Sequence, residues 1–338
     1  MRRYALLALL MALFAPVVEA RQITDMAGRQ VEVPEHIGRV VGSVSPVTWM
    51  IYAIDPALLA AVNSVPSGAD QEYLCQDLKN LPVIGGFGAT RGGHQEALLA
   101  LHPDVVVFWG WGQAAANRRQ AQQLEALGIP VVFVELDRLE QYAEALRFLG
   151  DLLNRRERAE QLANYGDRAL ASVRTATADI PADQRVRVYY AEGMDGLSTE
   201  PQESFHAELI PLAGGINVHQ GGLKHYSGRE RLSMEQVLLY NPQVVLVQER
   251  AFFNVVQTDA RWQKVRAIRD GRVCLIPDLP LNWFDRPPSF MRFLGLQWLA
   301  HRLYPQRFPL DLRAEPRRFY RLFLGLELGD EQLEQIWD

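Results

Sequence analysis

Two kinds of side chain in this sequence are suited to holding a small molecule. Aromatic rings offer flat apolar faces to a bulky organic ligand, and arginines bind carboxylates, catecholates and other anions through two N–H groups at once. Both kinds follow segments that we expect to form buried strands, and parallel α/β sheets bind ligands at the carboxyl ends of their strands. The predicted ligand-binding residues are Ser45, Arg91, Trp109, Trp111, Tyr190, His225, Tyr226, Arg229, Trp283, Phe284 and Arg286.

The histidines and carboxylates do not have the spacing of a metal site, because no two histidines lie four residues apart as on one helix face. His225 next to Tyr226 is one exception, since a tyrosine oxygen binds ferric and haem iron. Direct capture of a metal ion stays the secondary interpretation. The sequence has no nucleophile elbow, phosphate-binding loop or pair of catalytic carboxylates. We therefore predict a binding protein without a cofactor, and an exported metal-dependent enzyme is the alternative.

A short pattern occurs once in each half of the chain, at residues 94–107 and 233–246. Each copy predicts a short helix with a glutamate near its start, then a proline, then a buried apolar strand. Glu96 and Glu235 occupy the same place in the two copies. A duplicated unit indicates two similar lobes, and clefts between lobes are where ligands bind.

Short apolar segments alternate with helical segments in both halves, which indicates parallel βαβ arrangements. Residues 139–180 form a helical stretch with a regular apolar face. We expect this stiff connection to permit only modest closure around a ligand. The tail, residues 319–337, is predicted to be helix packed on the second lobe. The predicted strands are residues 39–42, 81–85, 104–109, 130–136, 185–191, 243–249 and 272–276, and residues 23–34 read as a hairpin.

Together these patterns predict an α/β fold with two similar lobes. Each lobe has a parallel central sheet, a long helix joins them, and the ligand cleft lies between them. The predicted boundaries are residues 1–20 for a signal peptide, 21–138 for the N-terminal lobe, 139–180 for the connecting helix region and 181–338 for the C-terminal lobe.

Residues 1–20 have the pattern of a signal peptide. Arg2 and Arg3 precede an apolar run too short to span a bilayer comfortably, and the segment ends in the small residue Ala20. A retained N-terminal anchor is the alternative. Cleavage after this segment leaves an exported, soluble chain, most simply in a bacterial periplasm.

Charge and cysteine content narrow the class of partner. The formal net charge of −5 argues against a nucleic-acid partner, which needs a basic face. Cys75 and Cys274 are the only cysteines, one in each half of the chain. An oxidising compartment permits a disulfide between them. We expect two separate, buried thiols instead, since nothing around them has metal-site spacing.

Several of these segments together resemble the substrate-binding proteins of iron–siderophore and vitamin B12 ABC importers. They are the hairpin at residues 25–34, the region 85–104, the segment 208–217 with its Ala213-Gly214-Gly215, and the two glutamate-bearing repeats. The stretch from Trp283 to Ser289 looks like members linked to iron chelates, with some relatives handling molybdate. The resemblance extends in order over nearly the whole chain. It implies a monomer that works with an ABC importer permease in the inner membrane.

By their place in the motif, the resemblance implies that Glu96 and Glu235 dock to the permease. Two exposed anions on separate lobes also steer association. The alternative is that each glutamate only stabilises its helix dipole.

The expected cargo is an iron–siderophore complex, and a corrinoid, haem or a molybdate-type oxyanion are the alternatives. A compact oxyanion needs several backbone N–H donors and little aromatic lining, which this sequence does not favour. A ligand sensor that transports nothing is a further alternative.

Overall fold

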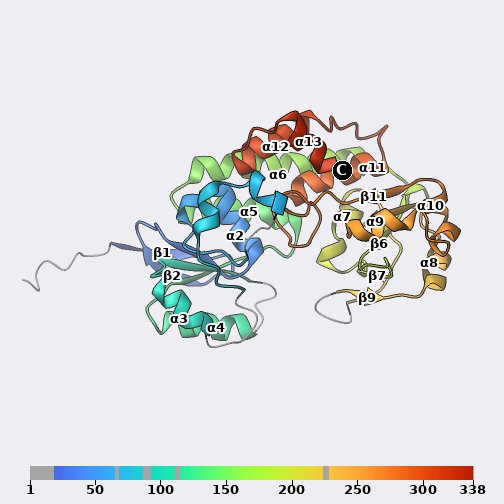
Figure 1. The fold of residues 1–338 in the computed structure, drawn as a ribbon. Coiled ribbons are helices and arrows are strands. Elements are labelled where there is room, and N and C mark those ends of the chain that lie inside the picture. The colour runs from blue at the N-terminus through green and yellow to red at the C-terminus, as the bar shows by residue number, and fades with distance from the viewer. Residues whose placement is uncertain (1–18, 65–67, 87–92, 111–114, 224–227, 338) are drawn as a thin grey trace, which may run out of the picture.

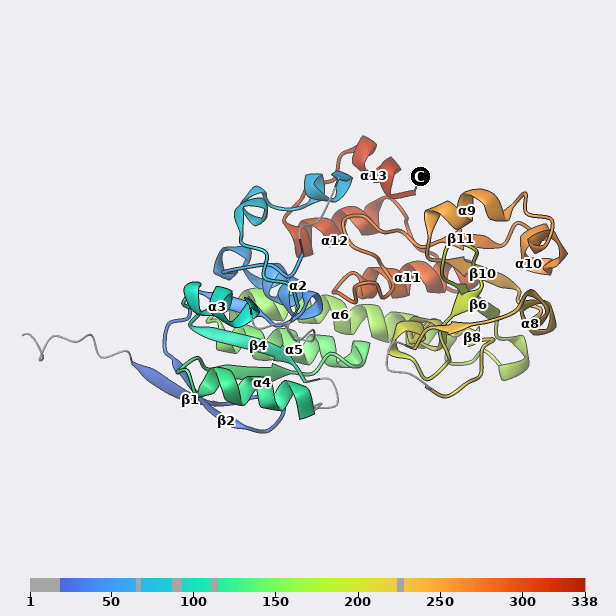
Figure 2. The same cartoon turned by 60° about the horizontal axis from the view of Figure 1, so that its bottom comes forward.

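The computed structural model describes residues 19–64, 68–86, 93–110, 115–223 and 228–337, and the fold is two lobes at opposite ends of an elongated molecule (Figures 1 and 2). Each lobe is built on a parallel sheet. The first has the strand order β3-β4-β5 and the second the order β11-β10-β6-β8. The predicted α/β fold with two parallel-sheet lobes is confirmed.

The first lobe begins with an antiparallel hairpin and continues into its sheet. Apolar residues on alternate positions of each strand point to opposite faces, and both faces are covered by helices, because Val40, Val105 and Val107 pack in one cluster and Val41 and Val106 in another. The elements are β1 (Ala20–Thr24), β2 (Gln30–Pro34), β3 (Val40–Gly42), α2 (Ser45–Ile54), α3 (Gly93–Ala100), β4 (Val105–Trp109), α4 (Ala115–Glu125) and β5 (Val131–Val134).

The second lobe repeats this scheme with shorter helices. One face of its sheet, carrying Tyr189 and Val245, packs on an outer cluster, and the other face, carrying Tyr190 and Leu246, packs toward the centre of the molecule. The elements are β6 (Arg187–Ala191), β7 (Ser198–Thr199), α7 (Leu209–Leu212), β8 (Ile216–Asn217), β9 (Glu230–Arg231), α8 (Met234–Tyr240), β10 (Val244–Val247), α9 (Arg250–Val256), α10 (Arg266–Arg269) and β11 (Val273–Leu275).

The duplicated pattern forms the same local structure in both lobes. In the first lobe α3 leads through His102 and a proline into β4, and in the second α8 leads through Asn241 and a proline into β10. His102 and Asn241 both have a positive φ, +46° and +44°, in the left-handed region that non-glycine residues rarely adopt. The two copies therefore share even an uncommon backbone turn, as expected of a repeated unit.

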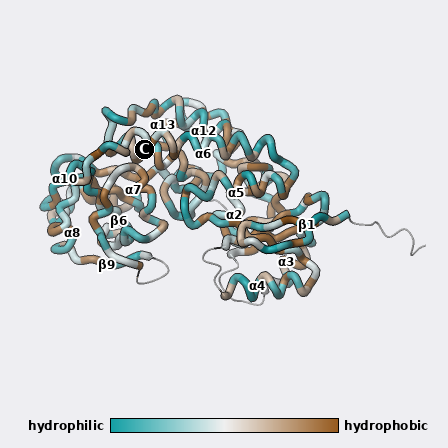
Figure 3. Tube along the Cα trace, turned by 180° about the vertical axis from the view of Figure 1, so that it is seen from behind, coloured by the Kyte–Doolittle hydropathy of each residue, from teal (hydrophilic) through white to brown (hydrophobic). Residues whose placement is uncertain are grey.

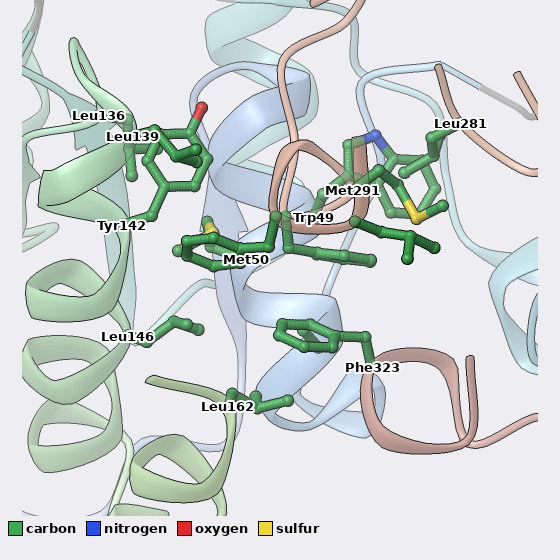
Figure 4. Packing of buried hydrophobic residues seen from close by; sticks show 14 of the residues in the cluster. Trp49, Met50, Leu136, Leu139, Tyr142, Leu146, Leu162, Leu281, Met291 and Phe323 are labelled. Atoms are coloured by element: carbon green, nitrogen blue, oxygen red, sulfur yellow. The ribbon is translucent and has the colours of Figure 1, made fainter. Parts of the chain in front are cut away.

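Two long antiparallel helices, α5 (Leu139–Leu152) and α6 (Arg156–Thr177), connect the lobes, and α11 (Arg292–Leu303) packs on α6. Inward faces of both sheets belong to one continuous hydrophobic cluster with these helices. Figure 4 shows its centre, where Trp49 and Met50 of α2 lie between Tyr142 of α5 and Phe323 near the C-terminus. Because this cluster runs without interruption from one lobe to the other, the junction is a packed core rather than a flexible linker.

The C-terminal helices, α12 (Ala314–Leu324) and α13 (Asp330–Trp337), correct the prediction for the tail. The Tyr73 hydroxyl of the first lobe donates to the Gln332 carbonyl, and α12 packs on α2. The tail also contacts the second lobe as predicted, because the Tyr320 hydroxyl donates to the Leu279 carbonyl and Trp337 packs against Trp283. The prediction therefore missed only the contacts with the first lobe. The tail is also two helices rather than one, because Gly325 ends α12 at a φ of +67°.

Other predicted elements differ in detail. Residues 81–85 contribute only an isolated parallel bridge, between Val62 and Val83, instead of a strand. Cys75 and Cys274 are free thiols, as predicted, although Cys75 is half-buried. Over the part of the chain that the structure describes, none of the helices combines the length and apolar character needed to cross a bilayer.

Candidate ligand-binding site between the lobes

A pocket of about 310 Å³ lies where the two lobes meet. The first lobe contributes Trp49, which lies one turn into α2, and also Ser64 and Asp70 from the segment after α2. The second lobe contributes the ends of two strands and the long segment that returns toward α11. The lining residues are Trp49, Ser64, Asp70, Gln248, Asp278, Pro280, Leu281, Asn282, Arg286 and Pro287.

Arg286 is the cation among these lining residues, and buried carboxylates fix its position. Its Nε donates to Oε1 of Glu192 and its Nη2 donates to Oε1 of Glu200. Both carboxylates have no exposed surface, whereas about a quarter of the Arg286 side chain is exposed. Among the described residues, Nη1 makes no hydrogen bond. The two carboxyl groups thus hold the guanidinium through Nε and Nη2, and Nη1 remains free to bind a ligand.

A second arginine shares this anchor. Arg229 donates from Nη2 to Oε1 of Glu192 at 2.9 Å, so Arg229 and Arg286 converge on one carboxylate. Glu192 directly follows β6, at the carboxyl end of a parallel strand. The second carboxylate, Glu200, follows the short strand β7. The strand ends of the second lobe therefore place the two guanidinium groups together.

A layer of buried polar groups supports the arginine from below. The Tyr190 hydroxyl donates to Oδ1 of Asp285 and lies 2.8 Å from the side-chain amide of Gln248. The other Asp285 oxygen is 2.6 Å from Nδ1 of His206. Oδ1 of Asn282 accepts from the backbone N–H of Asp285 and so fixes the loop that carries Arg286. Buried polar networks of this kind hold a site in one geometry.

The protonation of Glu200 decides the charge of the site. Burial raises the pKa of this carboxyl from 4.5 to about 8; the Ser204 hydroxyl and Arg286 lower its pKa, and the charge of Glu192 raises it further. At neutral pH Glu200 therefore keeps its proton. The charges of Arg229 and Arg286 then face Glu192 and Asp285, and the Arg286 guanidinium is no longer neutralised by both of its carboxyl partners.

Replacing Glu200 with glutamine is expected to remove a pH dependence of folding. The folded-state pKa near 8 lies above the unfolded value, so the native protein binds more protons and its stability falls as pH rises from about 5 to 8. One proton corresponds to a slope of about 1.4 kcal/mol per pH unit. Denaturant unfolding across this range should show this loss in the wild type and not in Glu200→Gln. Parallel curves for the two proteins would show that Glu200 is ionised throughout.

The structure brings together three of the residues predicted from the sequence, Tyr190, Arg229 and Arg286. Ser45 is half-buried at the start of α2, one turn before Trp49. The predictions for Arg91, Trp111, His225 and Tyr226 lie outside the described residues.

Three predicted aromatic residues are corrected, because their rings belong to the core. Trp283 and Phe284 are each only 1% exposed, and Trp283 packs edge-on against Trp337. Trp109 is also buried; its Nε1 donates to Asp137 and its ring meets Phe205 of the other lobe. None of the three offers an open apolar face to a bulky ligand.

Sequence reasoning left out several residues that line the pocket or anchor Arg286, and some of them had a detectable signal. Gln248 directly follows β10, but the predicted strand at residues 243–249 extended past it, so only a correct strand end would have selected it. Glu200 follows a strand of only two residues, which the apolar pattern does not reveal. Trp49 and Asn282 lie within a helix and a loop, and only the packing of the two lobes brings them to the pocket.

The two repeat glutamates lie on the surface of separate lobes. Glu96 is exposed in the first turn of α3, and Glu235 is exposed in the first turn of α8. The Ser233 hydroxyl accepts from the Gln236 N–H and caps α8. Hydrogen bonds from its own backbone N–H and from Ser233 lower the pKa of Glu235, so this carboxyl is charged at neutral pH.

No cluster of three or more His, Cys, Asp or Glu side chains suited to a metal ion occurs within the described ranges. Glu192 and Glu200 lie close together in the site, but an arginine lies between them. The Arg286 guanidinium binds both Glu192 and Glu200 and so occupies the space in which they would share a cation.

Known proteins resemble this chain over most of its length. The sequence model described as periplasmic binding protein matches residues 52–279. The molybdate-binding protein MolA of Haemophilus influenzae is 28% identical over 93% of this chain and 94% of its own length. The vitamin B12-binding protein of Salmonella typhi is 32% identical, over 58% of this chain and 68% of its own.

Solved structures agree in fold. An ABC transporter solute binding protein from Sulfurospirillum deleyianum superposes with a TM-score of 0.87 and 38% identity, covering 94% of this chain and 99% of its own. The structure of Haemophilus influenzae MolA bound to molybdate has a TM-score of 0.74 and 25% identity, covering 91% and 99%. With a family match over more than half of its length, the chain belongs to the periplasmic binding proteins, the solute-binding components of ABC importers.

Proposed function

We propose that this periplasmic protein binds a compact oxyanion of the molybdate class between its lobes and delivers it to the importer permease. The observation that carries the proposal is Arg286, which lines the interlobe pocket and is anchored from behind by Glu192 and Glu200. A preorganised guanidinium is a strong hydrogen-bond donor to an oxyanion. The amide side chains of Gln248 and Asn282 also line the pocket.

Two further observations support a compact ligand over a bulky one. Trp109, Trp283 and Phe284, the described part of the predicted aromatic lining, are buried in the core. The likeness to MolA extends over 93% of the chain, whereas the likeness to the vitamin B12-binding protein of Salmonella typhi is limited to 58% of it. The siderophore cargo expected from the sequence therefore becomes the second candidate.

One observation favours that second candidate, a ferric chelate. Asp70 and Asp278 line the pocket from the two lobes, and their negative charges repel a bare oxyanion more than a ligand whose charge is offset by a ferric ion. Asp278 lies 3.7 Å from Arg250, which offsets its charge. The two candidates thus differ in which charged groups of the pocket meet the ligand.

A ligand screen separates these candidates. A true ligand raises the melting temperature because it binds the folded form preferentially. The screen contains molybdate, tungstate, sulfate and phosphate, ferric catecholate and hydroxamate chelates, haemin and cyanocobalamin. We expect molybdate or tungstate to stabilise the mature protein most. Stabilisation by a ferric chelate, haemin or cyanocobalamin with none by any oxyanion would overturn the proposal.

We further propose that Glu96 and Glu235 dock the loaded protein on the permease. Replacing both with alanine should abolish most ligand uptake by cells, because the two lobes lose the charges that steer and orient docking. The ligand affinity of the purified variant should stay within about twofold of the wild type. Uptake is measured with radiolabelled ligand in a strain lacking the chromosomal copy.

The matched control is Glu157→Ala with Glu331→Ala. These glutamates are also exposed in the first turns of helices, α6 and α13, but lie outside the repeat. This control should leave uptake unchanged. Equal loss in both double variants, or loss of affinity in the first, would exclude a specific docking role.

The remaining expectations from the sequence complete the proposal. Residues 1–20 are a signal peptide removed on export, and the mature chain works as a monomer with lobes at residues 21–138 and 181–338. Amino-terminal sequencing and light scattering of protein purified from the periplasm test these two points. An intact Met1 or a stable dimer would contradict them.

A further inference from the structure

A second concave site lies on the helical face of the molecule, away from the interlobe pocket. It is a groove of about 530 Å³ between α6 and α12. Figure 3 shows hydrophilic residues along both helices. In Figure 1 the two helices lie along the top of the molecule. The groove is lined by Arg158, Gln161, Asn164, Arg168, Arg318, Arg321 and Leu322.

The lining is strongly basic. It contains four arginines, two amide side chains and no acidic residue among the described residues. Arg158, Gln161, Asn164 and Arg168 recur every three to four positions, so they share one face of α6. Arg318 and Arg321 are neighbours on α12 by the same rule. The like charges of Arg318 and Arg321 repel one another at this spacing, and the four arginines give the groove a positive charge that an anion would offset.

Two of these arginines have one acidic partner each, and a third has none among the described residues. Arg321 donates from Nε and Nη2 to the two carboxylate oxygens of Glu327, and both side chains are about two-thirds exposed, so solvent screens this pair. Arg318 lies 3.8 Å from Glu315, whose carboxylate already accepts a hydrogen bond from Tyr165. Arg168 forms no ion pair within the described part of the chain.

The fourth arginine, Arg158, has a structural role because it connects the C-terminal ends of two helices. Arg158 donates from Nε to the Ala53 carbonyl, in the last turn of α2, and from Nη2 to the Leu322 carbonyl, in the last turn of α12. Burial lowers the pKa of this guanidinium. Helix C-termini favour a cation, so Arg158 joins the ends of α2 and α12 and adds its charge to the lining of the groove.

We propose that this groove binds a small soluble anion bearing two or more phosphate groups, at a site separate from the transported solute. Guanidinium groups bind phosphate oxygens through two parallel hydrogen bonds. Several arginines on both walls match a ligand with more than one phosphate better than a single tetrahedral anion. The volume falls within the range of small-molecule sites.

The test measures pyrophosphate binding to the mature protein by isothermal titration calorimetry at low ionic strength. We expect one saturable site, and at least about tenfold weaker binding in the double variant Arg168→Gln/Arg321→Gln. Both residues are exposed, so the variant should fold, which circular dichroism verifies. Arg158 is left unchanged because of its bonds to the two helix ends.

Three controls make the result decisive. Arg261→Gln/Arg266→Gln removes two exposed arginines that pair with nearby acids in the second lobe, and it should bind pyrophosphate as the wild type does. Arg286→Gln should also retain pyrophosphate binding, because Arg286 lines the other pocket. The mature protein should not cosediment with phosphatidylglycerol vesicles.

The absence of saturable pyrophosphate binding would overturn the proposal. So would equal weakening in the Arg261/Arg266 control, which would indicate general charge attraction. Loss of binding in Arg286→Gln would place pyrophosphate in the interlobe pocket instead. Binding to vesicles without binding to pyrophosphate would replace the soluble ligand with a lipid surface.

Discussion

Replacing Arg286 with glutamine is expected to weaken oxyanion binding by about 100-fold. Loss of a charged hydrogen-bond donor from a partly buried site costs about 3 kcal/mol, and each 1.4 kcal/mol is a factor of ten in affinity. The fold should survive, because Glu192 keeps Arg229 and the raised pKa of Glu200 lets that carboxyl stay neutral at pH 7. Calorimetric titration with molybdate or tungstate measures the affinity.

Two matched variants show whether the oxyanion affinity depends on the geometry of the Arg286 guanidinium or on positive charge alone. Arg286→Lys keeps the charge but lacks the planar guanidinium that binds Glu192 and Glu200 through two nitrogens and leaves Nη1 for the ligand, so it should recover only part of the affinity. Arg229→Gln removes a cation whose side chain is 40% exposed, and its effect should be about tenfold at most. Unchanged affinity in Arg286→Gln, with a folded protein, would show that the ligand binds elsewhere.

Replacing Glu208 with glutamine is expected to destabilise the protein by about 3–5 kcal/mol, the usual result of removing one partner from a buried ion pair. Arg292 of α11 has no exposed surface, and its Nη2 donates to Oε2 of Glu208 at 2.6 Å. The same carboxylate accepts from the Leu139 N–H, which begins α5. The pair therefore connects the second lobe to the helices that join the lobes. Urea unfolding measures the loss.

The expected loss of stability arises because Glu208→Gln leaves Arg292 buried without a counter-charge. Two further variants test this cause. The double variant Arg292→Met/Glu208→Leu replaces the pair with apolar side chains of similar size and should be more stable than Glu208→Gln. Glu203→Gln changes an exposed glutamate nearby and should alter stability by less than about 0.5 kcal/mol. A Glu208→Gln variant as stable as this control would mean that Arg292 is neutralised by another group.

The fold was predictable because its signals are local. Strands such as Val105–Trp109 and Val244–Val247 are continuous apolar runs, and the repeat showed that two lobes share one plan. The contacts of the tail with the first lobe were not predictable, because its partner Tyr73 lies far away in the sequence. An amphipathic helix shows which face it buries and not which lobe receives that face.

The site was predictable only in part, for a related reason. The strand-end rule selects Tyr190, Arg229 and Arg286, which the structure brings together through Glu192 and Asp285. Composition does not distinguish an aromatic ring that faces a ligand from one that fills a core. The sequence therefore predicted that Trp283 and Phe284 contact the ligand, whereas both are buried in the structure.

Anomalous X-ray diffraction from crystals of the mature protein grown with tungstate tests the central claim most directly, because it locates the heavy atom without assumptions about the ligand's shape. We predict one strong peak in the pocket between the lobes, within hydrogen-bonding distance of the Arg286 guanidinium. A peak only outside that pocket, or a pocket left empty at saturating tungstate, would contradict the account.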